Sequence, residues 1–267
     1  MSGENHLVKE VEIAERAARA AGEIIMAFYG KDYRIRDKGK GNPVTTADIE
    51  ANRELREIIL GSFPQDGWLS EEDHDNLRRL NAARVWVVDP IDGTKEFIAR
   101  IPQFAVSVGL VVDGRPVLGV VYNPVAAELY RAVKDCGGLL NGQPIHVSSR
   151  EEVKGALLLV SRSEPRRKFV RFAETCRLEP VGSIAYRLAK IASGIGDGTL
   201  TFRSVHEWDV CAGVLIVQEA GGVVLDGAGK GLLFNRPEAV HRGIVASNDI
   251  LAQTLQGMLA KSLAEKG

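Results

Sequence analysis

The segment 85–94 limits the fold of this chain more than any other part of the sequence. Four consecutive apolar residues, Val-Trp-Val-Val, are followed at once by Asp-Pro-Ile-Asp-Gly-Thr. A short apolar run of this kind predicts a strand that is buried in a sheet. The proline imposes a bend, and the glycine lets other groups approach the backbone closely. We therefore expect a buried strand whose end carries Asp89 and Asp92, with both side chains turned toward one point.

The spacing of apolar residues predicts the other elements. A four-and-three spacing predicts a helix over 7–28 that ends at Gly30, and Thr46 is expected to cap a second helix with Ile49 on its apolar face. Residues 31–43 are basic and glycine-rich and are expected to form a mobile loop. We expect strands at 104–112, 117–122, 127–133, 156–160, 200–202, 223–225 and 244–246, and further helices at 164–176, 183–193, 208–220 and 249–263. The pattern predicts an α/β (α+β) protein of layered sheets and helices, with the site between the layers.

Length and composition are those of an ordinary globular protein. The chain has 267 residues, of which 45% are hydrophobic and 26% charged, so it can bury a core without disulfides. A net charge of −1 gives no basic surface for a nucleic-acid polymer, and we expect no such partner. The three cysteines are widely spaced, which predicts reduced thiols. Residues 1–5 lack the pattern of a secretion leader and no apolar stretch suits a membrane span, so we expect a cytoplasmic protein without a membrane partner.

Acidic residues carry the candidate chemistry. Besides Asp89 and Asp92, these are Glu71 in the run Leu-Ser-Glu-Glu-Asp, Asp209 beside a tryptophan at the start of an apolar helix, and Asp48 at the start of the second helix. Hard divalent cations such as Mg²⁺ prefer oxygen ligands, usually carboxylates together with water and substrate phosphate. The bend that follows the buried strand also frees a carbonyl oxygen, that of the isoleucine between the two aspartates, as a further ligand.

Each of these features also has an ordinary structural interpretation. Asp-Gly is a common turn, Asp48 and Asp209 could stabilise helix N-termini, and the run around Glu71 could be a solvated loop. Their presence together in one chain favours a metal site. The aspartates of DPIDGT are three residues apart, whereas the aspartyl-phosphatase signature DxDGT places them two apart. The spacing therefore disfavours a covalent aspartate nucleophile and favours attack by a metal-activated water.

Taken together, several motifs resemble the lithium-sensitive, magnesium-dependent phosphatase superfamily of inositol monophosphatase. They are TTAD (45–48), SEE (70–72), WVVDPIDGT (86–94), WDVCAG (208–213) and QEAGG (218–222). The resemblance covers nearly the whole chain. It implies a layered αβαβα sandwich of the inositol monophosphatase or fructose-1,6-bisphosphatase type. That fold would form a single catalytic unit over residues 1–267, with approximate lobes at 1–148 and 149–267.

The same resemblance implies a set of site residues and a metal cofactor. Two or three Mg²⁺ ions would be held by Glu71, Asp89, the Ile91 carbonyl, Asp92 and Asp209. Asp48 and Thr94 match the pair that activates the attacking water. The amides of Gly93 and Thr94 match the phosphate cradle. One ion would activate the water and another would stabilise the leaving oxygen.

Finer motifs bear on the substrate. DGTKEFI (92–98), GVVYNPV (119–125) and Ser-Arg-Ser at 161–163 resemble the 3'(2'),5'-bisphosphate nucleotidases more than the inositol enzymes. Those nucleotidases convert 3'-phosphoadenosine 5'-phosphate, a by-product of sulfate assimilation, to AMP and phosphate. Phe202 stands where the inositol enzymes carry an inositol-contacting glutamate, which argues against inositol phosphates as the main substrate.

The chain also departs from the nucleotidase pattern. Nucleotidases often carry a lysine after Gly-Ser-Ser, whereas the present segment reads Gly-Ser-Ile-Ala-Tyr-Arg. Ser183 in this segment is expected to contact substrate, and Arg187 could supply the missing charge or lie on a helix surface. Arg203 could meet a second phosphate or be a solvated strand-end arginine. Lys38 and Lys40 could cover the phosphate or be ordinary solvated lysines.

These observations predict a magnesium-dependent phosphomonoester hydrolase, with bisphosphate nucleotidase favoured. An inositol monophosphatase or a broad sugar-phosphate phosphatase on the same machinery is the alternative. A non-catalytic member that binds phosphorylated ligands would belong to a different class, but every metal and water-activating position is intact, which favours an enzyme. The expected partners are a small phosphorylated substrate and a second copy of the chain in a homodimer.

Overall fold

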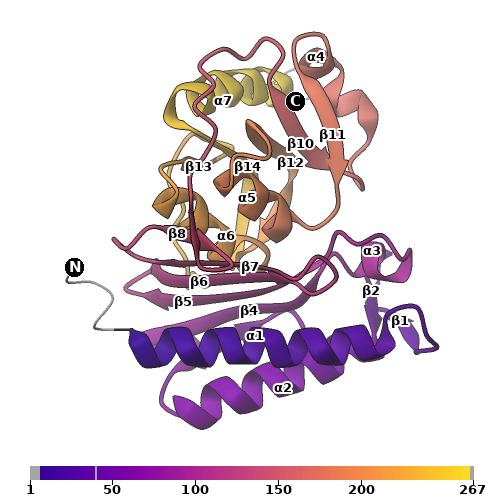
Figure 1. Ribbon diagram of the computed structural model, residues 1–267, viewed down its shortest axis with the longest axis vertical. Helices are drawn as coiled ribbons and strands as arrows, with labels where there is room; N and C mark the ends of the chain where they lie inside the picture. Colours follow the sequence, from indigo (N-terminus) through magenta and orange to yellow (C-terminus); the bar gives the residue numbers. More distant parts are fainter. Residues whose placement is uncertain (1–6, 40, 265–267) are drawn as a thin grey trace.

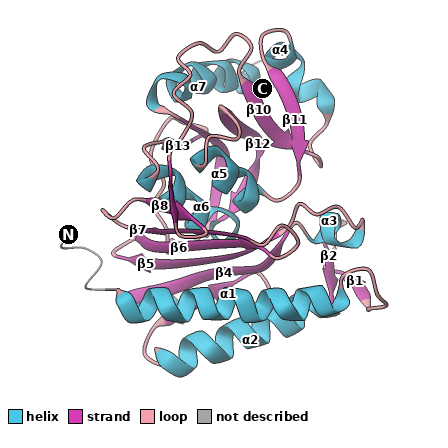
Figure 2. Cartoon of the chain, viewed as in Figure 1, coloured by secondary structure: helices cyan, strands magenta, loops and turns pink. Residues whose placement is uncertain are grey.

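The computed structural model describes residues 7–39 and 41–264, and its helices and sheets are stacked in layers (Figure 1). In order through the stack, the layers are α1 (Val8–Phe28) with α2 (Thr46–Ser62), a seven-stranded sheet, α5 (Ile184–Ala192) with α6 (Glu207–Glu219), a five-stranded sheet, and α4 (Val170–Ala173) with α7 (Asp249–Ala264). The alternation of helices and sheets is equally plain in Figure 2. The expected αβαβα sandwich is confirmed.

The seven-stranded sheet carries the buried strand that ends in the aspartates. Its strands, in spatial order, are β3 (Gly67–Ser70), β4 (Arg84–Asp92), β5 (Ala105–Val112), β6 (Arg115–Asn123), β7 (Glu128–Val133), β8 (Gly138–Leu140) and β9 (Gln143–Ile145). Only β3 and β4 are parallel; the other neighbours are antiparallel. The predicted strands β4 to β7 are confirmed, whereas β3, β8 and β9 are too short for their apolar pattern to reveal them.

The five-stranded sheet belongs to the second half of the chain. Its strands, in spatial order, are β11 (Arg177–Val181), β10 (Leu157–Ser161), β12 (Gly198–His206), β14 (Val240–Ser247) and β13 (Val223–Asp226). The predicted helix over 164–176 is wrong, since this segment holds only a short 3-10 turn and α4. Glu164 precedes a proline, which disfavours helical backbone there. The chain passes between the sheets from Ile145 to Leu157, and the division into lobes at 148 and 149 stays a proposal.

The region before α2 is more ordered than the sequence predicted. The expected loop over 31–43 contains β1 (Ile35–Asp37), which pairs antiparallel with β2 (Pro43–Thr45). The N-cap of α2 is Thr45 rather than Thr46. Ile49, predicted for the apolar face, is 49% exposed. Ile49 is therefore not on the buried face of the helix, whereas the predicted positions Leu55 and Ile59 are.

Helix α6 is buried between the two sheets, which explains why it is apolar on nearly every side. Two glycines of the first sheet allow it to lie close. A Cβ atom at Gly119 would come within 2.6 Å of the Ala212 carbonyl oxygen, and one at Gly109 within 2.6 Å of the Cys211 sulfur. Among the described residues, no helix is both long and apolar enough to cross a membrane.

Candidate active site

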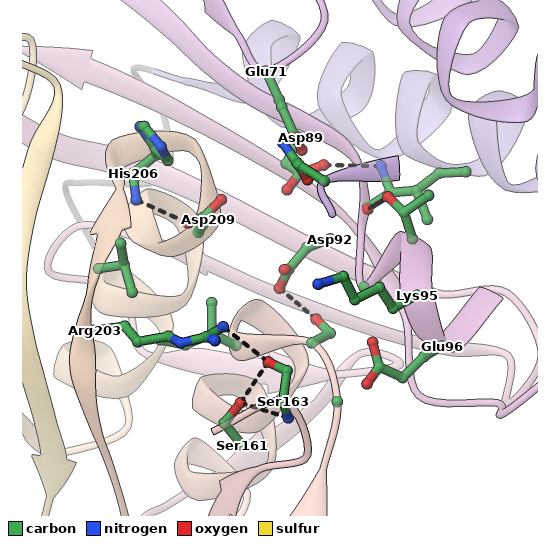
Figure 3. A pocket seen from close by; sticks show the side chains of 18 of the residues that line it. Glu71, Asp89, Asp92, Lys95, Glu96, Ser161, Ser163, Arg203, His206 and Asp209 are labelled. Carbon is green, nitrogen blue, oxygen red and sulfur yellow. Dashed lines mark hydrogen bonds between the residues drawn. The ribbon is translucent and has the colours of Figure 1, made fainter. Parts of the chain in front are cut away.

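A cavity of about 510 Å³ opens where the two halves of the molecule meet. Its walls come from the end of β4, the start of α3 (Thr94–Ile98), the end of β12 and the first turns of α5 and α6. Figure 3 shows side chains from these elements pointing into the same space. The fold thus brings together residues that lie far apart in the sequence, which is how the separate acidic motifs come to face one cavity.

The aspartates from the two halves form one cluster. One carboxylate oxygen from each of Asp89, Asp92 and Asp209 lies within 4.8 Å of the others, a spacing that could hold a metal ion. The pairing of β4 with β5 is irregular between Asp89 and Asp92. This irregularity lets two residues three apart face the same point, although a regular strand would send them to opposite faces. The predicted convergence of these side chains is present.

Backbone and hydroxyl groups hold each aspartate in place. The Ile91 amide donates to Asp89 Oδ1 at 2.9 Å. Asp92 Oδ2 accepts from the Ser183 hydroxyl at 2.5 Å and from the Ala185 amide at 2.6 Å, so the first turn of α5 fixes it. Asp209 Oδ2 accepts from the His206 amide at 2.8 Å and caps α6. Each of these carboxylates keeps an oxygen free of these bonds for a ligand in the cavity.

Burial and mutual repulsion make it costly for all the carboxylates of the cluster to be ionised at once. Burial, followed by the charges of Glu71 and its neighbouring aspartates, raises the pKa of Asp89 well above its ordinary value. The pKa of Asp209 is raised well above its ordinary value for the same reasons. Burial raises the pKa of Asp92 to about 6, although hydrogen bonds from Ser183 and Ala185 oppose the shift. A bound cation would remove this electrostatic penalty.

Glu71 follows the end of β3 and lines the same cavity. Its Oε1 is 2.9 Å from the ammonium of Lys38, which also lies 2.8 Å from Glu72 Oε1. Burial alone would lower the pKa of Lys38, but the two carboxylates outweigh it and raise that pKa. Burial raises the pKa of Glu72 to about 7 despite the lysine. Lys40, the other expected lysine, lies outside the described residues.

Asp48 and Thr94, predicted to activate the attacking water, lie within hydrogen-bond distance of each other. The Thr94 hydroxyl lies 3.0 Å from Asp48 Oδ1 and 3.2 Å from the carbonyl oxygen of Ile91. The other oxygen of Asp48 accepts from the amide and the hydroxyl of Thr45, at 2.7 and 2.6 Å. Asp48 is 1% exposed and does not itself line the cavity, whereas Thr94 and Ile91 do. Burial raises the pKa of Asp48, so this carboxylate holds a proton more readily than an exposed aspartate does.

Gly93 makes the turn between β4 and α3 with a φ of 100°, which only glycine adopts easily. Gly93 and Thr94 both line the cavity. Helix α3, which follows, has only five residues. We therefore treat the amides at its start as part of the turn and not as the N-terminus of a long helix.

The wall opposite the aspartates carries hydroxyl groups and arginines. The Ser161 and Ser163 hydroxyls are 3.1 Å apart, and Arg203 Nη1 donates to the Ser163 hydroxyl at 3.3 Å, as Figure 3 shows. Arg187 also lines the cavity but is only 3% exposed, so the alternative of a surface helix residue is wrong. Ser183 lines the cavity too, although its hydroxyl is already bonded to Asp92.

Phe202 does not contribute to this wall. It is not among the cavity-lining residues, and its ring packs against Phe169 and Phe172 in the outer core. Thr201 and Arg203 line the cavity in its place. The argument that Phe202 faces a bound polyol is therefore wrong, because alternate residues of a strand point to opposite faces. The absence of a glutamate at this position remains a property of the sequence.

Sequence reasoning did not predict several cavity residues. Glu96, Glu164, Thr201 and Trp208 line the cavity, and so does His206, whose ring stacks on Trp208 with centroids 4.3 Å apart. Trp208 and His206 are close to Asp209 in sequence, which suggested that His206 could line the site although a structural role was favoured; Glu164 and Thr201 have no such link to the carboxylate motifs. Glu96 lies two residues after the DGT turn, within the DGTKEFI motif, which was the available signal for it.

Comparisons with known proteins agree with the fold and the cluster. The family model described as "Inositol monophosphatase family" matches residues 7–267. The inositol-1-monophosphatase of Synechocystis sp. is 38% identical over 224 residues, covering 80% of this chain and 77% of that protein. The structure of an IMPase from Thermotoga maritima has a TM-score of 0.87 at 28% identity, covering 97% of this chain and 100% of that one. The structure of SaIMPase-II bound to 2'-AMP has a TM-score of 0.79 at 25% identity, with coverages of 94% and 93%.

The fold and the acidic cavity define a phosphatase of the metal-dependent, layered αβαβα class. The chain belongs to the inositol monophosphatase family.

Proposed function

We propose that this chain is a magnesium-dependent phosphomonoester hydrolase, and that its substrate is a 3'(2'),5'-bisphosphate nucleotide such as 3'-phosphoadenosine 5'-phosphate. The observation that carries the proposal is the aspartate cluster beside the Thr94–Asp48 pair on one cavity. The cluster can hold cations, and the pair can hold a water molecule and its proton. No further nucleophile is required for hydrolysis by water.

The donor set suits Mg²⁺. The cluster offers carboxylate oxygens only. Hard cations such as Mg²⁺ prefer these ligands, whereas softer metals prefer sulfur or imidazole ligands. In this proposal Asp89, Asp92, Asp209, Glu71 and the Ile91 carbonyl hold two or three ions. When bound, magnesium acts as a Lewis acid that lowers the pKa of water and stabilises charge on phosphate oxygens. Glu71 must then share its carboxylate between Lys38 and a cation.

The chain's own residues position the reactants. The Thr94 hydroxyl lies between Asp48 Oδ1 and the Ile91 carbonyl, so a water that donates to Thr94 is oriented by a fixed group. The proton that leaves the water passes through the Thr94 hydroxyl to Asp48, whose burial favours the protonated form. The backbone amides of Gly93 and Thr94 bind the phosphate oxygens. Ser183 keeps Asp92 in its orientation.

The nucleotide assignment rests on the cavity wall opposite the metal cluster. Arg203 is exposed at the cavity rim and bonded to Ser163, next to Ser161. A solvent-accessible arginine with adjacent hydroxyls is suited to a second phosphate. The DGTKEFI motif favours the same substrate. SaIMPase-II, a protein of similar fold, has structures with 2'-AMP bound and with inositol monophosphate bound, so it is compatible with either kind of substrate. The name of the Synechocystis relative favours inositol phosphate instead, so an inositol monophosphatase is the alternative.

A phosphate-release panel tests the proposal. Purified protein with Mg²⁺ is assayed on 3'-phosphoadenosine 5'-phosphate, myo-inositol 1-phosphate, fructose 1,6-bisphosphate and AMP. We expect kcat/KM for the nucleotide bisphosphate to exceed that for inositol 1-phosphate by at least about tenfold, or about 1.4 kcal/mol of transition-state binding. Equal or better hydrolysis of inositol 1-phosphate would replace the nucleotidase assignment by the alternative. No phosphate release from any of them would indicate a binding protein.

A further inference from the structure

Arg187 is a buried cation, and two of its three guanidinium nitrogens lack hydrogen-bond partners among the described residues. The residue lies one turn into α5, is 3% exposed and lines the cavity. Its Nε and Nη1 atoms are buried and donate to no group among the described residues. Buried guanidinium groups are almost always hydrogen-bonded, because an unpaired donor loses its hydration without compensation. A group that enters the cavity can supply the missing acceptor.

Three carboxylates act electrostatically on Arg187, and two of them already accept hydrogen bonds from side-chain hydroxyls. The charges that act on it belong to Asp92, Glu164 and Glu96. Asp92 accepts from Ser183 and Ala185 and lies in the proposed metal cluster. Glu164 accepts from the Thr201 hydroxyl and the Phe202 amide and lies 3.7 Å from the Lys168 ammonium. Of these three carboxylates, Glu96 is the one to which no side chain of the described residues donates a hydrogen bond.

Glu96 is an acidic residue of the same cavity that lacks a side-chain hydrogen-bond donor within residues 7–39 and 41–264. It is 8% exposed and lines the same cavity, and its carboxylate accepts a hydrogen bond from its own backbone amide but from no side chain among the described residues. Its carboxyl group lies tightly against Gly182, where a Cβ atom would come within 2.5 Å of its Cδ. Figure 3 shows the carboxylate turned toward the cavity. In the described part of the chain, Glu96 and Arg187 do not form an ion pair with each other, so a carboxylate without a side-chain donor and a guanidinium without an acceptor for two of its nitrogens line the same cavity.

Given the phosphatase function proposed above, we propose that Glu96 and Arg187 bind the free hydroxyl groups that neighbour the phosphate ester on the substrate's leaving group. A hydroxyl donates to a carboxylate and accepts from a guanidinium, so it satisfies both side chains. A second phosphate accepts only and would be repelled by Glu96, and an apolar group would leave both unpaired. Because Asp92 lies in the metal cluster, the subsite is next to the carbon that carries the phosphate. The substrate class is a phosphate monoester with an adjacent hydroxyl, as in a ribonucleotide or a cyclitol phosphate.

The test compares substrates that differ by one hydroxyl. Values of kcat/KM are measured for 3'-phosphoadenosine 5'-phosphate and its 2'-deoxy analogue with the wild type, Glu96→Gln, Arg187→Met and Arg187→Lys. We expect the wild type to prefer the ribonucleotide by about tenfold or more. This preference falls below about threefold in Glu96→Gln and Arg187→Met and is partly restored in Arg187→Lys. The matched controls Arg167→Met and Glu174→Gln, at exposed positions, keep the wild-type ratio.

Two results would overturn the inference. One is a wild-type ratio near one; the other is an equal loss on both nucleotides in Glu96→Gln, which would indicate a structural role. If neither nucleotide is hydrolysed but inositol 1-phosphate is, the nucleotidase assignment fails. The hydroxyl-binding inference can then still be tested with other substrates. The comparison is then between inositol 1-phosphate and p-nitrophenyl phosphate, which has no hydroxyl. A selective loss on inositol 1-phosphate in the two variants supports the subsite, and an equal loss on both compounds refutes it.

Discussion

Replacing Asp92 by asparagine should stabilise the metal-free protein and abolish its activity. Burial holds the pKa of Asp92 at about 6, against an ordinary value of 3.8. That difference corresponds to about 3 kcal/mol by which the folded state disfavours the ionised carboxylate. Because the folded pKa is raised, the cost is absent below about pH 4 and complete above about pH 6. The amide oxygen of asparagine can still accept from Ser183 and Ala185, so we expect a net gain of about 1–3 kcal/mol at pH 7.5.

The measurement is thermal and chemical unfolding of protein that has been stripped with a chelator, at pH 4 and at pH 7.5. For 267 residues, 1 kcal/mol corresponds to about 2 °C in Tm, so Asp92→Asn should unfold about 2–5 °C higher at pH 7.5 and near the wild type at pH 4. With saturating Mg²⁺ the difference in Tm between Asp92→Asn and the wild type should shrink or change sign, because only the intact cluster is stabilised by binding the metal. Asp32→Asn, at an exposed position, is the control and should change neither. An unchanged or lower Tm for metal-free Asp92→Asn at pH 7.5 would refute the reasoning.

Further predictions concern the water-activating pair, acid stability and helix packing. Thr94→Val removes the hydroxyl but keeps the shape, so kcat should fall by about 100-fold or more with an unchanged Tm; a loss below threefold in steady-state kinetics would exclude the pair. Burial lowers the pKa of His241 from 6.5 to about 4, so the free energy of unfolding should fall as the pH drops from 6.5 through 4. In denaturant titrations, His241→Phe should show a smaller fall over this pH range. Gly119→Ala forces a methyl group against the Ala212 carbonyl and should lower the free energy of unfolding by about 2 kcal/mol or more. The control Gly61→Ala, with open space around it, should not destabilise the protein. Equal unfolding midpoints for the two variants would contradict the close packing of α6 on the sheet.

The sequence predicted those parts of the molecule in which a local pattern has one physical solution. The apolar run at 85–88 favoured a buried strand because it is short and ends at Asp-Pro, and the helix over 7–28 had a clear apolar face and a glycine stop. The spacing in DPIDGT indicated that Asp89 and Asp92 turn toward one point, and the structure has them in one cluster with Asp209. Short strands such as β8 and β9 escaped prediction, because three residues carry too little pattern.

Side-chain direction was the main limit on predicting the site. The sequence could not show that Phe202 lies in the outer core while its neighbours Thr201 and Arg203 face the cavity. Nor could it show that Arg187 is buried, because the sequence predicted a helix over 183–193 but did not indicate which of its faces lies against the cavity. Glu96 and Glu164 reach the cavity through tertiary packing that joins distant segments. Such contacts depend on how the layers stack, which no local spacing encodes.

Metal dependence tests the central claim most directly. Protein is stripped with a chelator and passed into metal-free buffer, and phosphate release from 3'-phosphoadenosine 5'-phosphate and from inositol 1-phosphate is followed as Mg²⁺ is added. The cluster of Asp89, Asp92 and Asp209 predicts no turnover without metal and saturable recovery with Mg²⁺ on at least one of these substrates. Undiminished phosphate release from the stripped protein would contradict the account.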